Sequence, residues 1–177
     1  MICAYEITLE QMLNARDARA EKQNMLCTKY LLPVISLTVN IPGAFKSTPV
    51  SSRIFREGYD ELIKRLLEDG FAPVYQETCD LITGSEGYVV VNMDKCAIKE
   101  LVIRIEMEHP LGRLLDFDVI GQDGMAISRE ALGYPKRKCL ICNEEAHVCA
   151  RSRAHSIDNL MEKIQSMTDA YFLVYIE

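Results

Sequence analysis

Apolar and polar residues alternate most regularly over residues 35–41, where every odd position is aliphatic and every even position carries a hydroxyl or an amide. Because side chains alternate between the two faces of a strand, this pattern predicts a strand with one buried face. Two more extended stretches are expected at 72–82 and 88–93, joined by the glycine-containing loop 83–87. Together these segments predict a central sheet.

Other segments repeat their apolar residues at helical spacing. Their expected ranges are about 8–30, 51–70, 94–100 and 156–167. Each follows a residue whose side chain can accept a hydrogen bond from a backbone N–H group of the first helical turn. The expected capping residues are Thr8, Ser51 or Ser52, Asp94 and Ser156.

Charged residues interrupt the apolar pattern in two neighbouring segments. Over residues 101–108 the odd positions are apolar, and from residue 104 the even positions are charged; residues 115–119 repeat this alternation. Between the two segments, Pro110 and Gly112 supply the chemistry of a tight reversal. The pattern therefore predicts two antiparallel strands joined as a hairpin.

The polar face of the expected hairpin holds three carboxylates. Pairing Glu106 with Asp116 and Arg104 with Asp118 keeps charge on one face, whereas a one-residue slip would turn it toward the core. Like charges this close are costly unless a cation lies between them. Because Mg²⁺ prefers carboxylate and phosphate oxygens, the cluster indicates a metal site for phosphoryl or nucleotidyl transfer; the alternative is a solvated strand face.

The expected elements follow the order helix, strand, helix, two strands, short helix, two strands and a helical tail. This order predicts an α+β fold with a mixed or antiparallel sheet of about five strands, helices packed on it and a ferredoxin-like core as one option. A length of 177 residues and a hydrophobic content of 49% suit a single domain. Within it we distinguish an α+β core at 1–135 and a helical tail containing Cys and His at 136–177.

A net charge of −6 argues against general binding to nucleic acid or to anionic membranes. No uninterrupted apolar run approaches the length of a membrane span, and the first residues lack the features of a signal peptide. We therefore expect the protein in the cytoplasm, where a reducing environment keeps its seven cysteines as thiols.

The tail contains the side chains of a zinc site. Three thiolates and one imidazole form a common tetrahedral ligand set, and the first two cysteines have the spacing of a zinc knuckle. The expected ligands are Cys139, Cys142, Cys149 and His155. His147 is a rival fourth ligand, because the spacing from 149 to 155 is longer than is usual in zinc fingers. The alternatives are buried structural thiols and a nucleophilic Cys149 assisted by His155.

The segment His-Pro-Leu-Gly-Arg-Leu-Leu-Asp-Phe-Asp-Val at 109–119 resembles a signature of the holo-acyl-carrier-protein synthases of citrate lyase, also called apo-citrate lyase phosphoribosyl-dephospho-CoA transferases. Further matches follow in the same chain order: the region around Arg16, residues 36–46, Ser-Ser-Arg-Ile-Phe at 51–55, and residues 139–155. The resemblance extends over nearly the whole chain.

This resemblance implies transfer of phosphoribosyl-dephospho-CoA from 2′-(5″-triphosphoribosyl)-3′-dephospho-CoA to a serine of the citrate lyase acyl carrier protein, the γ subunit. The serine oxygen would attack the innermost phosphorus, and pyrophosphate would leave. A competing hypothesis is a non-catalytic, zinc-stabilised binding module that docks the citrate lyase subunits. Mg²⁺-dependent labelling of the carrier separates the two.

The resemblance also implies catalytic roles. Asp116 and Asp118 would bind one or two Mg²⁺ ions, with Glu106 as a third ligand or as the base that receives the serine proton. His109 is an alternative base, although beside a proline it can equally cap the reversal. Gly112 indicates a backbone position that needs conformational freedom or close approach of a ligand.

Basic residues would hold the phosphates. Arg113, Lys46 and Arg53 are expected at the triphosphate, and Arg16 on the first helix can reach a phosphate or remain on a solvated surface. The tail is the most basic region of the chain, and could bind the nucleotide part of the donor, bind the acidic carrier, or be a solvated surface. Its basic residues are Arg137, Lys138, Arg151 and Arg153.

Overall fold

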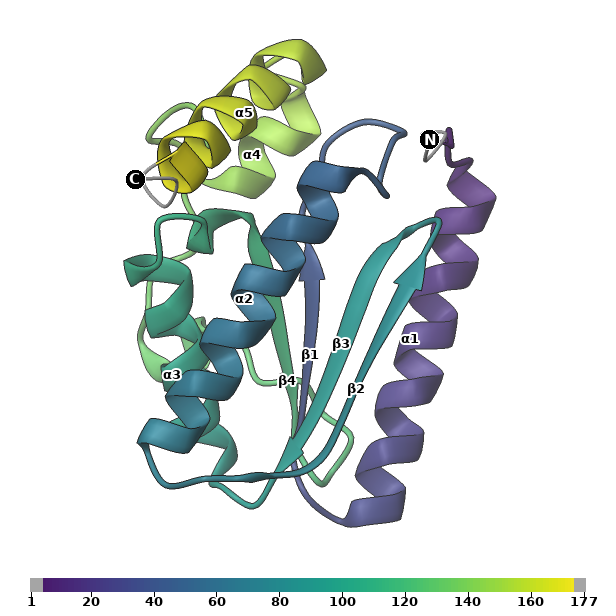
Figure 1. Ribbon diagram of the computed structural model, residues 1–177, viewed down its shortest axis with the longest axis vertical. Coiled ribbons are helices and arrows are strands. Elements are labelled where there is room, and N and C mark those ends of the chain that lie inside the picture. The colour runs from purple at the N-terminus through teal and green to yellow at the C-terminus, as the bar shows by residue number, and fades with distance from the viewer. Residues whose placement is uncertain (1–4, 174–177) are drawn as a thin grey trace.

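Residues 5–173 are described in the computed structural model, where helices cover both faces of a sheet (Figure 1). The elements in chain order are α1 (Leu9–Tyr30), β1 (Val34–Val39), α2 (Pro49–Glu68), β2 (Pro73–Leu81), β3 (Gly84–Val91), α3 (Lys95–Glu108), β4 (Leu115–Ile120), α4 (Ala146–Ser152) and α5 (Ile157–Leu173). The predicted α+β class is confirmed.

The sheet has the strand order β2-β3-β1-β4, and every neighbouring pair is antiparallel. Four strands form it within residues 5–173, where about five were expected. One expected strand is missing because residues 101–108 are helical. β4 therefore pairs with β1 instead of with a preceding hairpin strand.

Helix α3 corrects the predicted hairpin. Asp94 caps it as expected, but the helix continues beyond residue 100 to Glu108. Its buried positions include Ile98, Leu101 and Ile105, which follow helical spacing and lie on the side that packs toward the sheet. Apolar residues over 101–108 satisfy both the helical and the strand period, and the helical one decides the structure.

The two faces of the sheet differ in character. Helices α2 and α3 cover one face and share with it the main apolar core, which includes Leu37 and Phe117. Helix α1 crosses the other face, where a smaller apolar cluster forms around Leu26, Tyr88 and Ile120 near its C-terminal half (Figure 1). The N-terminal half of α1 instead meets polar side chains of the sheet.

Capping explains most helix starts. Thr8 and Gln11 form the predicted capping box, with N···O distances of 3.2 and 2.9 Å, and Ser156 accepts the N–H of Asn159 at the start of α5. The prediction for α2 is wrong: Thr48 is its cap, and Ser51 is the third helical residue of the same capping box. The expected loop 83–87 is also shorter, since β3 already begins at Gly84.

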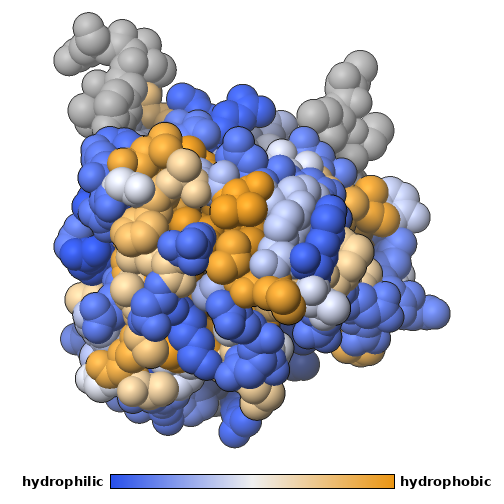
Figure 2. Space-filling view, turned by 90° about the horizontal axis from the view of Figure 1, so that it is seen from below, coloured by the Kyte–Doolittle hydropathy of each residue, from blue (hydrophilic) through white to orange (hydrophobic). Residues whose placement is uncertain are grey.

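The C-terminal helices α4 and α5 lie over one end of the sheet (Figure 1). Ile164 and Phe172 of α5 join the main core, so the tail packs on the same apolar cluster as α2 and α3. At the opposite end, apolar side chains are scattered in patches among polar ones (Figure 2). None of the helices within residues 5–173 combines the length and the hydropathy that crossing a membrane requires.

Candidate active site

A small polar cavity of about 130 Å³ lies between the N-terminal half of α1, the end of β1 and the start of β3. Arg16 and Arg19 reach it from α1, Lys46 from the loop after β1, and Asp116 from β4. Its other polar lining residues are Thr38, Asn40, Ser51, Thr83 and Ser85. The fold thus brings together Arg16, Lys46 and Asp116, which were predicted from separate parts of the chain.

The cations of this cavity are held in different ways. Arg19 is fixed by Glu86, whose carboxylate accepts its Nε and Nη2 hydrogens at 3.0 and 2.8 Å, and the Tyr88 hydroxyl donates to the same carboxylate. Lys46 donates to the backbone oxygen of Ile41. Burial lowers the pKa of Lys46, and the positive charge of Arg16 lowers it further.

Arg16 is exposed on α1. Within residues 5–173, no carboxylate oxygen lies within 4.0 Å of its guanidinium. Two neighbouring cations without a carboxylate between them favour an anion as ligand, because the anion relieves their mutual repulsion. Arg16 and Lys46 are therefore suited to bind phosphate oxygens.

Asp116 and Asp118 project from β4 toward the α1 side of the sheet. Thr38 and Ser36 of β1 lie opposite them in the register. The Asp118 residue is exposed. Its carboxylate is nevertheless partly desolvated by surrounding protein atoms, which raises its pKa, and the neighbouring Asp116 carboxylate raises this pKa further. Ser36 Oγ is the one buried side-chain N or O atom in residues 5–173 that lacks a hydrogen-bond partner.

Glu106 belongs to a different cluster. It lies on α3 with a side chain that is 4% exposed, and Arg129 Nη2 is 2.5 Å from its Oε2. Its Oε1 contacts Arg137 and accepts the N–H of Phe117 at 3.3 Å. The prediction that Glu106 shares a strand face with the aspartates is therefore wrong, because its segment is helical. Two arginines and a backbone N–H occupy its oxygens.

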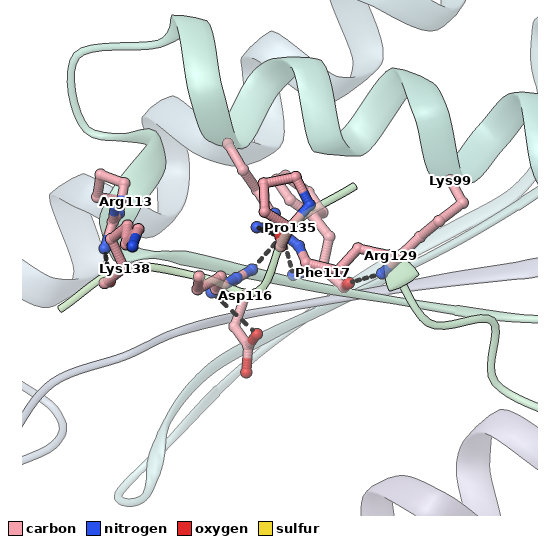
Figure 3. Close-up of polar contacts among 9 residues, drawn as sticks. Lys99, Arg113, Asp116, Phe117, Arg129, Pro135 and Lys138 are labelled. Carbon is pink, nitrogen blue, oxygen red and sulfur yellow. Dashed lines mark hydrogen bonds and ion pairs between the residues drawn. The ribbon is translucent and has the colours of Figure 1, made fainter. Parts of the chain in front are cut away.

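Side chains of α3 also form hydrogen bonds with the backbone of β4, along the edge of this strand that no other strand within residues 5–173 pairs with. Lys99 Nζ donates to the backbone oxygen of Phe117 at 2.9 Å, while Glu106 accepts the N–H of the same residue. Figure 3 shows Lys99 reaching toward β4 from α3, with Asp116 pointing away from the helix. Arg137 connects the two sides, because its Nη1 lies 3.3 Å from Asp116 Oδ1.

A larger cavity of about 710 Å³ lies beside the small one, beneath the C-terminal tail. Asn40 lines both cavities. The cationic side chains of the larger cavity are Arg113, Arg137, Lys138 and Arg153. Arg113 additionally donates to the backbone oxygen of Lys138.

The four predicted metal ligands of the tail form one cluster. The ligand atoms of Cys139, Cys142, Cys149 and His155 all lie within 4.8 Å of one another, a grouping that can hold a metal ion such as zinc. Cys142 Sγ is 3.5 Å from Cys149 Sγ and 3.3 Å from His155 Nε2. The rival ligand His147 instead pairs with a glutamate at 3.3 Å.

The thiols of this cluster differ in acidity. Burial raises the pKa of Cys139, but backbone N–H groups of Cys142 and Ile141 outweigh this effect and bring it to about 7. Burial and the neighbouring thiols raise the pKa of Cys149 to about 12. The close grouping of four ligand atoms around Cys149 favours a metal ligand over the alternative of a nucleophilic Cys149.

Comparison with known proteins assigns the family. A family model described as apo-citrate lyase phosphoribosyl-dephospho-CoA transferase matches residues 7–171. The chain belongs to this family. A relative from Vibrio cholerae named probable apo-citrate lyase phosphoribosyl-dephospho-CoA transferase is 38% identical over 169 residues, which cover 93% of each chain.

Two further relatives agree with this assignment. The apo-citrate lyase phosphoribosyl-dephospho-CoA transferase of Citrobacter koseri is 31% identical over 163 residues, covering 92% of this chain and 89% of the relative. Protein CitXG of Haemophilus influenzae is 35% identical over 162 residues, covering 92% of this chain and 35% of the relative.

Five residues predicted to act in this transferase site line neither cavity: Glu106 and Asp118, described above, and Arg53, His109 and Gly112. The guanidinium of Arg53 sits 3.6 Å from the centre of the Phe172 ring. His109 ends α3 as its C-terminal capping residue, and its Nδ1 accepts the N–H of Leu111 at 3.1 Å, so it does not cap the hairpin that was predicted. At Gly112 an added Cβ would lie 2.7 Å from the backbone oxygen of Glu106, so close backbone approach, and not a ligand, requires glycine there.

Several polar residues of the transferase site were not predicted. Asn40 stands in one of the segments that resemble the family, but its side chain carries no distinctive signal by itself. No sequence pattern marks Lys99 or Arg129, because the contact that each makes is with a partner distant in sequence. Arg137 was expected only as part of a basic tail, and its contact with Asp116 depends on the tertiary fold.

Proposed function

We propose that this protein transfers phosphoribosyl-dephospho-CoA from its triphosphoribosyl donor to a serine of the citrate lyase acyl carrier protein, with release of pyrophosphate. The family match over residues 7–171 supports this reaction. The observation that carries it is the small cavity, where Arg16, Arg19 and Lys46 face Asp116. Such an arrangement suits a triphosphate that reacts beside an acidic group.

In this reaction the serine oxygen of the carrier attacks the innermost phosphorus of the donor. The bond from that phosphorus to the oxygen bridging it to the second phosphorus breaks, and its electrons leave with pyrophosphate. Arg16 and Lys46 would hold the phosphate oxygens and offset the charge that develops on the leaving group. Catalysis would rest on positioning and charge neutralisation.

Asp116 and Asp118 are the proposed ligands of Mg²⁺. Two features support the fit: Asp116 and Asp118 share one face of β4, so that each adds to the negative charge around the other, and the buried Ser36 Oγ opposite Asp118 lacks a protein partner. A bound Mg²⁺ would neutralise phosphate charge at this site. We exclude Glu106 from this role, because two arginines and the Phe117 N–H occupy its oxygens, and propose that the serine proton is lost to water as the new P–O bond forms.

The cluster of Cys139, Cys142, Cys149 and His155 is the proposed zinc site. Three sulfurs and one imidazole nitrogen complete four-coordination, which is typical of structural zinc. We therefore assign this metal a structural role in the tail, separate from the chemistry at Asp116.

Fold type and location complete the proposal. The order β1-α2-β2-β3-α3-β4, with the sheet order β2-β3-β1-β4, favours a ferredoxin-like assignment. We propose the cytoplasm as the location of this protein, because a reducing compartment keeps cysteines free to serve as metal ligands. We propose the acyl carrier protein as the macromolecular partner of the reaction.

Pyrophosphate release tests this function. Wild-type protein, donor, apo-carrier and Mg²⁺ should release pyrophosphate, and Asp116→Asn should slow the release at least 10²-fold while leaving the thermal unfolding transition intact, because the amide removes a charge that holds the metal. Asp123→Asn is the matched control, since Asp123 is exposed and pairs with Lys95 at 2.9 Å, away from the site. Undiminished release by Asp116→Asn would disprove the proposed site, and no release by wild type would favour the docking module.

A further inference from the structure

The larger cavity is lined by positive charge, whereas the chain as a whole is negatively charged. Four cationic side chains line it, and no acidic residue does among those that the structure describes, although the chain carries a net charge of −6. These side chains are Arg113, Arg137, Lys138 and Arg153. A concentration of positive charge in an acidic protein favours a ligand that carries phosphate.

One wall of the same cavity is apolar. Aliphatic side chains come from the segment before β4, from the tail and from α5. They are Leu114, Leu140, Ile157, Leu160 and Ile164. A wall of this kind suits a base or an aliphatic chain, so the ligand should combine phosphates with apolar groups. The volume of about 710 Å³ is typical of cofactor sites.

The larger cavity adjoins the proposed reaction site directly. Asn40 lines both cavities, and Arg137 lines the larger one while contacting Asp116 at 3.3 Å. A donor with its triphosphate beside Asp116 can therefore extend into the larger cavity. Only one part of that donor combines phosphates with a base and an aliphatic arm, namely its dephospho-CoA portion.

We propose that the larger cavity binds the dephospho-CoA portion of the donor, with its diphosphate at the basic side chains and its adenine and pantetheine against the apolar wall. This inference rests on the proposed function, because the donor is named from it. Three of the four cluster ligands, Cys139, Cys149 and His155, also line the cavity. The metal site would thus fix the shape of the coenzyme pocket.

Binding of dephospho-CoA itself, measured by titration calorimetry on the full chain, tests the inference without any reaction. Wild type should bind it, and Ala150→Trp should weaken binding at least tenfold, because Ala150 lines the cavity and an indole would fill it. Val148→Trp is the matched control on the same helix, since Val148 is 43% exposed and does not line the cavity. Equal affinity of Ala150→Trp and wild type would overturn the inference.

Charge variants give a second test that does not rely on filling the cavity. Lys138→Ala and Arg153→Asn should each weaken dephospho-CoA binding about five- to tenfold through the loss of a charged hydrogen bond. Asparagine is chosen at 153 because Arg153 has a φ of 51°, which asparagine tolerates. Arg16→Ala, which alters only the small cavity, should leave dephospho-CoA affinity unchanged but raise the KM for the triphosphoribosyl donor.

The two proposals fail in different ways. If wild type releases pyrophosphate but the cavity variants bind dephospho-CoA normally, the coenzyme pocket is disproved and the function stands. If dephospho-CoA binds as described but no pyrophosphate is released, the function is disproved and the pocket stands. Asp116→Asn should bind dephospho-CoA within about twofold of wild type, and a loss comparable to that of Ala150→Trp would contradict the separation of the two sites.

Discussion

At the scale of single residues, the surroundings of Lys46 favour the binding of an anion. Its ammonium is partly buried, donates to Ile41 and lies near Arg16, and both burial and this second cation lower its pKa. A lowered pKa means that the charged form of Lys46 destabilises the folded protein. A bound phosphate would offset this cost by pairing with the ammonium.

Replacing this lysine separates stability from function. Lys46→Met should raise the Tm by about 1–3 °C at pH 7, because the cost of burying the ammonium disappears, while the KM for the donor rises at least tenfold. The cost exists only while Lys46 is protonated, so the gain should shrink as the pH rises through the lowered folded pKa. Thermal melts from pH 7 to 10.5 measure this trend, and a lower Tm for Lys46→Met at pH 7 would contradict it.

Residue chemistry was predictable where it belongs to a local pattern. The pair Asp116 and Asp118 follows from alternation on one strand, and the structure keeps both on the same face. Glu106 was misplaced because its segment was predicted as a strand and is a helix, and its partners Arg129 and Arg137 come from a segment without regular periodicity. Such ion pairs are defined only by the tertiary fold.

At the scale of elements, α3 differs most from the prediction, because residues 101–108 form a helix and not a strand. Lys99 and Glu106 stand seven residues apart, about two helical turns, so both point to the same side and bracket the backbone of Phe117. A strand over the same residues could not present them together in this way. The helix thereby covers an edge strand that would otherwise expose unpaired backbone groups.

The buried carboxylate of Glu106, which accepts the Phe117 N–H, should be essential for the stability of the fold. Glu106→Ala leaves two arginines near an empty space and the Phe117 N–H unpaired, so the free energy of unfolding should fall by about 3–5 kcal/mol. Urea unfolding measures the loss. Glu100→Ala is the control, because Glu100 is exposed on the same helix. A difference between the two variants below about 0.5 kcal/mol would show that the cluster does not stabilise the fold.

At the scale of the whole molecule, the tail closes the larger cavity over one end of the sheet. Arg137 joins it to the core through Glu106 and Asp116, and the Cys and His cluster lies on the cavity wall. The α+β class and the ligand set of the cluster were predictable, since the order of elements and the cysteine spacing are local. The strand number and the two adjoining cavities were not, because they depend on how α3 and the tail pack.

Removing the metal should therefore affect the whole tail. We expect about one equivalent of zinc per chain by elemental analysis, and Cys142→Ser should lose it and lower the Tm, because Cys142 is a proposed ligand that does not line the cavity. Cys96→Ser, outside the cluster, should keep both metal and Tm. Purified protein without zinc, or an unchanged Tm in Cys142→Ser, would contradict the structural role.

The intact mass of the carrier after reaction is the most direct measurement of the central claim. Apo-carrier incubated with this protein, the triphosphoribosyl donor and Mg²⁺ should gain the mass of one phosphoribosyl-dephospho-CoA group on a serine. The same mixture with Asp116→Asn should leave the carrier mass unchanged over the same time. A carrier that stays unmodified with the wild-type protein, or is modified equally by Asp116→Asn, would contradict the account.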